Sequence, residues 1–84
     1  MERQVKISPI EQHVIDFVKK LRTERQLTQT DIADIIGVSR TFVTQAENKS
    51  EAGKYNLRHI NALAEHFGMS PREFLPERAV AEKL

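Results

Sequence analysis

The 84-residue chain contains no cysteine, so neither a disulfide framework nor a thiolate metal site can support its fold. It also lacks an apolar run of the roughly 20 residues that span a bilayer. The start MERQVKIS has no apolar stretch of the kind found in signal peptides. We therefore expect a soluble cytoplasmic protein that is stabilised by its hydrophobic core alone.

An excess of charge of one sign is also missing. The formal net charge is +1, which by itself is a weak argument for nucleic-acid binding. The distribution is more informative, because basic side chains cluster within residues 19–25 and 40–58, and four glutamates come late in the chain: Lys19, Lys20, Arg22, Arg25, Arg40, Lys49, Lys54 and Arg58, then Glu65, Glu73, Glu77 and Glu82. The length allows one domain, too small for a separate sensing or catalytic domain.

Capping signals and apolar spacing predict three helices in the first half. Ser8 and Glu11 form a capping box around Pro9, so a first helix should run from Pro9 to about Glu24. Its apolar stripe is Ile10, Val14, Phe17, Val18 and Leu21. A second box at Thr28 opens a short helix that ends at Gly37, and Ser39 caps a third helix that ends near Asn48.

Two further helices are predicted after an exposed loop over residues 49–56. Asn56 caps a helix that ends at Gly68 and has the stripe Leu57, Ile60, Leu63, Ala64 and Phe67. Ser70 opens a short last helix that holds Phe74 and Leu75. The sequence thus predicts an all-α, compact five-helix bundle with an N-terminal arm over 1–8, a helical domain over 9–76 and a C-terminal tail over 77–84.

The outer side of the third predicted helix is the most informative surface. Residues at helical spacing i, i+3, i+4 and i+7 are all polar and uncharged: Thr41, Thr44, Gln45 and Asn48. A solvated helix face usually carries Glu and Lys, whereas Gln and Thr side chains suit adenine and thymine edges and Arg40 suits guanine. Taken alone, the stripe is also compatible with an ordinary polar surface.

The frame around this stripe resembles the lambda-repressor-like (Cro/XRE-type) helix-turn-helix family. The resemblance covers residues 18–75 and rests on LRTERQLTQTDIADIIGVSRTFVTQAEN followed by INALAEHFGMSPREFL. It implies a sequence-specific double-stranded DNA-binding transcriptional regulator, of the repressor kind, that reads an inverted-repeat operator as a homodimer. It also implies a prokaryotic or phage-encoded protein that works at the nucleoid.

The resemblance assigns roles to individual positions. The base-reading positions are Arg40, Thr41, Thr44 and Gln45, and the DNA-backbone positions are Thr28, Gln29, Asn48, Lys49 and Lys54. Arg22 and Glu47 match a pair that forms a partly buried salt bridge in this family. The sequence departs from the family pattern at Lys49, where glycine is common, and the nearest glycine is Gly53.

Little in the sequence points to catalysis or to a bound cofactor. The histidines His13, His59 and His66 match no metal-ligand set and are interpreted as surface residues. No nucleophile and base pair or glycine-rich phosphate loop is evident, so we expect no enzyme, metal, cofactor or small-molecule ligand. Tyr55 either stacks on a nucleic-acid backbone, packs locally or meets a protein partner.

Dimerisation is expected to use the C-terminal half, because the helix-turn-helix must face DNA. The candidate interface residues are Phe67, Met69, Phe74 and Val80, with Leu75 beside them. The alternative is that these side chains close the core of the monomer. A rival function is a protein-interaction module, or an antitoxin component that uses the same fold to bind a toxin.

Overall fold

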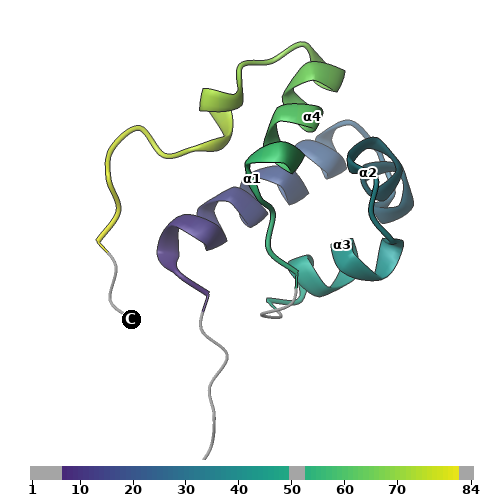
Figure 1. Cartoon of the computed structure of the whole chain (residues 1–84), viewed down its shortest axis with the longest axis horizontal. Helices are drawn as coiled ribbons and strands as arrows, with labels where there is room; N and C mark the ends of the chain where they lie inside the picture. Colours follow the sequence, from purple (N-terminus) through teal and green to yellow (C-terminus); the bar gives the residue numbers. More distant parts are fainter. Residues whose placement is uncertain (1–6, 50–52, 82–84) are drawn as a thin grey trace, which may run out of the picture.

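The computed structural model describes residues 7–49 and 53–81 and contains four α-helices followed by one turn of 3₁₀ helix (Figure 1). The helices are α1 (Pro9–Glu24), α2 (Gln29–Ile36), α3 (Arg40–Glu47) and α4 (Leu57–Phe67), and the 3₁₀ turn is η1 (Pro71–Phe74). No strand occurs in the described residues. The all-α prediction is confirmed.

Local capping determines where the helices begin and end. The Ser8, Thr28 and Asn56 side chains each accept a hydrogen bond from the backbone N–H three residues later, at the starts of α1, α2 and α4. Gly37 and Gly68 end α2 and α4 with φ of 74° and 67°, a left-handed conformation that costs glycine little. The boundaries therefore fall where these signals predict them.

The fifth predicted α-helix is wrong, because residues 71–74 form only a single 3₁₀ turn. The physical reason is Pro76, since the residue before a proline is sterically pushed out of the helical region. Leu75 accordingly has extended backbone angles, with φ −110° and ψ 154°. The described part of the tail after it, up to Ala81, has no regular structure.

The core lies where α1, α2, α3, α4 and η1 meet. Its largest fully buried side chains are Ile15, Val18, Ile32, Val43, Leu63 and Phe74. The Phe74 ring packs edge-on against Phe17, with the ring centroids 4.9 Å apart. Phe74 thus attaches the 3₁₀ turn to α1 and closes the core of the monomer, so we no longer count it among the dimer residues.

Other assignments at the ends of the apolar stripes also need correction. Ile10 and Leu57 were expected inside the core but are 38% and 75% exposed, while Ile15, absent from the predicted stripe, is 2% exposed. Phe67 is half-buried and covered by the Arg25 guanidinium, which lies 5.0 Å from the ring centroid. The exposed large apolar side chains of the described residues therefore lie at the starts of α1 and α4 and at Leu75, directly after η1, and Phe67 is not among them.

Candidate nucleic-acid interface

The helix α3 lies along one edge of the molecule, joined to α2 by a tight turn (Figure 1). Gly37 supplies the left-handed residue of this turn, and the Val38 N–H donates to the Ala33 carbonyl at 3.0 Å. Val43 and Ala46 point into the core and are fully buried. The opposite side of α3 is consequently turned outward, as the helix-turn-helix prediction requires.

The structure places most of the predicted DNA-contacting residues on this outer side. Arg40 and Thr41 are exposed in the first turn of α3, and Gln45 is half-exposed one turn further on. Asn48 and Lys49 are exposed at its C-terminal end. Arg40, Thr41, Gln45, Asn48 and Lys49 form what we call the α3 face.

Thr44 and Gln29, which were both expected to contact DNA, are already bonded to each other. The Thr44 hydroxyl donates to Gln29 Oε1 at 2.7 Å, and Gln29 Nε2 donates to Glu47 Oε1 at 3.0 Å. Both side chains are half-buried between α2 and α3. They hold the two helices in register, which leaves one Nε2 hydrogen of Gln29 for an external acceptor.

The Arg22–Glu47 salt bridge is present in the structure and anchors the same network. Arg22 Nε and Nη2 donate to the two Glu47 oxygens, each at 2.8 Å, and Nη1 donates to the Leu27 carbonyl at 3.0 Å. The Glu47 side chain is only 5% exposed. Burial by itself would raise the pKa of Glu47, but the bonds from Arg22 and Gln29 and the charges of Arg22 and Lys19 outweigh it and lower that pKa.

Lys49 and Lys54, the two lysines predicted to contact the DNA backbone, differ in their surroundings. Lys49 is exposed and adopts φ 60°, a left-handed conformation that residues other than glycine seldom adopt. Lys54 instead lies 3.6 Å from Glu11 Oε1 on α1. Its charge is matched within the protein, so we leave Lys54 out of the proposed phosphate contacts.

An aromatic cluster supports the inner side of α3. The Phe42, Tyr55 and His59 rings contact one another, with centroid distances of 5.9 Å from Phe42 to Tyr55, 5.3 Å from Phe42 to His59 and 6.1 Å from Tyr55 to His59. Tyr55 is buried, and burial raises the pKa of its hydroxyl, which has no hydrogen-bond partner among the described residues. Tyr55 therefore packs locally and is not available to stack on DNA.

His59 belongs to this cluster, so the prediction of an ordinary surface histidine is wrong. Its Nδ1 accepts a hydrogen bond from the Asn56 N–H at 3.2 Å and so completes the capping box of α4. Only an unprotonated Nδ1 can accept this bond. Partial burial, with a smaller contribution from the charge of Arg58, lowers the pKa of His59.

We expect this histidine to make stability fall as pH drops below about 6.5. Its pKa is lower in the folded state than the ordinary value of 6.5, so the unfolded chain binds the proton first and the stabilisation is fully present only above that value. Between pH 7 and pH 5 the melting temperature of the wild type should fall by a few degrees more than that of His59→Gln, because glutamine still closes the box. Equal losses in the two proteins would contradict this role.

A family comparison identifies the class of protein to which this geometry belongs. The model of the helix-turn-helix family matches residues 18–74, which include α2, the turn, α3, α4 and η1. The chain therefore belongs to the Cro/C1-type helix-turn-helix family of DNA-binding regulators, which are not enzymes. Neither a curated protein nor a solved structure matches the chain.

Two further findings concern the described residues only. None of their helices has the length and apolar character needed to cross a membrane. They also contain no group of three or more histidine and carboxylate side chains placed to hold a metal ion.

Gly53 is a structural residue that the sequence analysis treated only as part of a loop. A Cβ built at this position would lie 2.7 Å from the Ala46 Cα and equally close to the Gln45 carbonyl carbon. The loop after α3 can therefore return against the backbone of α3 only with glycine here. The presence of Gly53 in an otherwise charged and polar loop was the available signal.

Proposed function

We propose that this protein is a transcriptional repressor that reads an inverted-repeat operator as a homodimer, with α3 in the major groove. The observation that carries the proposal is the α3 face, where the exposed side chains on an edge helix are polar or basic and none is acidic. Arg40 can bond guanine and Gln45 can bond adenine, each through two atoms. Thr41 can contact a thymine methyl group.

The bonds behind the α3 face support this role. Base reading requires side chains whose supporting helix does not shift when the partner base changes. The Thr44–Gln29 and Glu47–Arg22 bonds attach α3 to α2 and to α1. We assign Thr44 and Gln29 to positioning, with the remaining Nε2 hydrogen of Gln29 directed to a phosphate, and Asn48, Lys49 and Thr28 to further backbone contacts.

Gln45→Ala should weaken binding to the selected operator by about 1–3 kcal/mol and leave affinity for random duplex almost unchanged, as expected for a base-reading side chain. The measurement is a titration of both DNAs by fluorescence anisotropy, after selection of bound sequences from a random pool. Equal losses on both DNAs would remove Gln45 from the base-reading set.

Lys49→Ala is the matched comparison at the other end of the α3 face. Loss of a phosphate contact should lower affinity for every sequence and reduce the slope of log affinity against log salt by about one unit. Alanine at residue 49 must adopt the same left-handed backbone as lysine. Any effect of the substitution on folding is measured separately, as a change in the melting temperature. A slope equal to that of the wild type would exclude a phosphate contact at Lys49.

The rival proposal is a protein-interaction module or antitoxin, which the near-neutral net charge of +1 favours. Binding to random duplex separates a DNA reader from a module that contacts only protein, whereas an antitoxin combines both activities and would also bind the duplex. A DNA reader loses affinity steeply with added salt, whereas a module that contacts only protein shows no such binding at low salt.

A further inference from the structure

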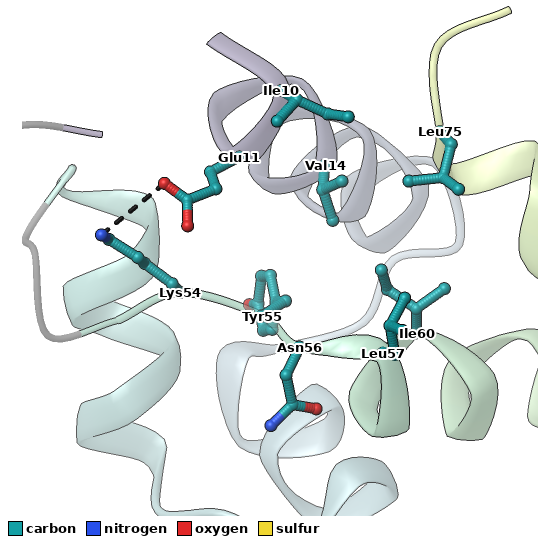
Figure 2. A pocket seen from close by; sticks show the side chains of 9 residues that line it. All are labelled: Ile10, Glu11, Val14, Lys54, Tyr55, Asn56, Leu57, Ile60 and Leu75. Carbon is teal, nitrogen blue, oxygen red and sulfur yellow. Dashed lines mark ion pairs between the residues drawn. The ribbon is translucent and has the colours of Figure 1, made fainter. Parts of the chain in front are cut away.

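Three large apolar side chains are exposed in the part of the chain that the structure describes, and all three line one groove. They are Ile10, Leu57 and Leu75, with exposed fractions of 38%, 75% and 39%. The groove is open, has a volume of about 420 Å³ and has Tyr55 among its lining residues. Figure 2 shows Ile10 and Val14 of α1 across from Leu57 and Ile60 of α4. Leu75 lies at the end of the groove that is farther from Lys54 (Figure 2).

The two walls of this groove carry opposite charges. Glu11 belongs to the α1 wall, and Lys54 belongs to the opposite wall, just before α4 (Figure 2). Their charged atoms are 3.6 Å apart, and the two side chains keep 38% and 31% of their surface exposed. Each wall thus offers one exposed apolar side chain, Ile10 or Leu57, and one charge, negative on the α1 wall and positive on the opposite wall.

We propose that this groove is the contact between two copies of the chain, related by a two-fold axis that runs along the groove. The proposal deepens the proposed function, because the homodimer is part of it. A half-turn about such an axis places the α1 wall of each copy over the α4 wall of the other. Leu57 then packs on the partner's Ile10, and the internal Glu11–Lys54 ion pair of one copy lies antiparallel to that of the other, so that each charge is next to the partner's opposite charge.

Complementarity between the walls favours a second copy over a foreign partner. A two-fold interface uses the same patch on both subunits, so that patch must be complementary to itself. A groove that receives another protein or a small molecule has no such requirement. Here the α1 wall fits the α4 wall in both charge and apolar character.

The position of the groove also fits a dimer that binds DNA. Lys54 and Tyr55 belong to the segment that returns from the C-terminal end of α3 to α4. Contact here lies beside α3, and the α3 face remains outside the groove. Phe67 and Met69 lie near the other end of α4, about 16 Å away for its 11 residues at 1.5 Å each. The contact is therefore separate from the surface that the sequence suggested.

The test begins with Leu57→Glu in the full chain, analysed by sedimentation equilibrium. Because Leu57 is 75% exposed, the variant should fold as the wild type does, which circular dichroism and thermal melting check. Its dimer dissociation constant should rise more than about tenfold, since a carboxylate would be buried against Ile10. The matched control is Met69→Gln, at the surface suggested by the sequence, which should leave the dimer intact.

A mixing experiment tests the pairing itself. Ile10→Lys alone should also weaken the dimer, since it places an ammonium against Leu57. An equal mixture of the Ile10→Lys and Leu57→Glu proteins should form a heterodimer, because one of its two contacts becomes an ion pair and the other stays Ile10 on Leu57. Native mass spectrometry distinguishes this heterodimer by mass. Absence of heterodimer in the mixture overturns the proposed pairing.

Failure of this contact and failure of DNA reading give different results. If Leu57→Glu remains dimeric, or if the wild type is monomeric both free and on its selected operator, the groove is not the dimer contact, although operator binding can persist. If the wild type dimerises through the groove and binds no DNA, the contact holds and the proposed function fails. A dimer that Met69→Gln disrupts and Leu57→Glu does not would place the interface at the far end of α4.

Discussion

Glu47→Ala should lower the free energy of unfolding by about 3 kcal/mol, the lower end of the range for removing one partner of a buried ion pair. The substitution leaves the Arg22 guanidinium without its two bonds to Glu47 and deprives Gln29 Nε2 of its acceptor. Since small domains are stable by only about 5–15 kcal/mol, the loss is a large fraction of the total. Urea denaturation followed by circular dichroism measures it.

Asp16→Ala provides the matched control on α1. Asp16 also accepts a side-chain hydrogen bond, from Gln12 at 2.8 Å, but this pair is exposed to solvent, whereas Glu47 is buried. Its removal should cost under about 0.5 kcal/mol. The double variant Arg22→Met/Glu47→Leu should be less destabilised than Glu47→Ala, because it leaves no buried charge without a partner. If Glu47→Ala cost no more than Asp16→Ala, the ion pair would have no part in holding α3.

Gly53→Ala should also be strongly destabilising, by about 3 kcal/mol, the upper end of the usual cost of overpacking. The added methyl group would meet the backbone of Ala46 and Gln45, which cannot turn aside as a flexible side chain can. Either the returning loop or the end of α3 must shift. Thermal and urea denaturation of the variant measure the loss.

Gly37→Ala makes a useful comparison because its cost has a different origin. A Cβ at Gly37 meets no atom within 4 Å, but the residue has φ 74°, so only the left-handed backbone penalises alanine, by about 1–2 kcal/mol. Gly53→Ala should therefore be the more harmful of the two. The reverse order would show that the loop after α3 is not held against its backbone.

Features determined by neighbouring residues could be predicted from the sequence. The caps at Ser8, Thr28 and Asn56 depend on contacts three residues away, and the structure contains all of them. The same local logic applied to Pro76 would have excluded the fifth α-helix. A proline disfavours helical backbone angles at the residue before it, here Leu75, and this rule can be applied without knowing the fold.

Features that depend on distant segments could not be predicted from the pattern alone. Whether Ile10 and Leu57 are buried depends on what packs over the first turns of α1 and α4, and helical spacing does not contain that information. The Thr44–Gln29 and Gln29–Glu47 bonds join residues 15 and 18 positions apart. Polar spacing placed Thr44 on the reading side, whereas its hydroxyl is engaged with α2.

The triple attachment of the Arg22 guanidinium has a consequence for the thermodynamics of association. One planar group bonds Glu47 at the end of α3 and the Leu27 carbonyl just before α2, so the two helices meet a duplex as a single preassembled body. Little chain entropy then remains to be lost when they dock. Under the proposed function, discrimination between operators then rests on base contacts and on the deformability of the duplex, with little adaptation of the protein to a mismatched site.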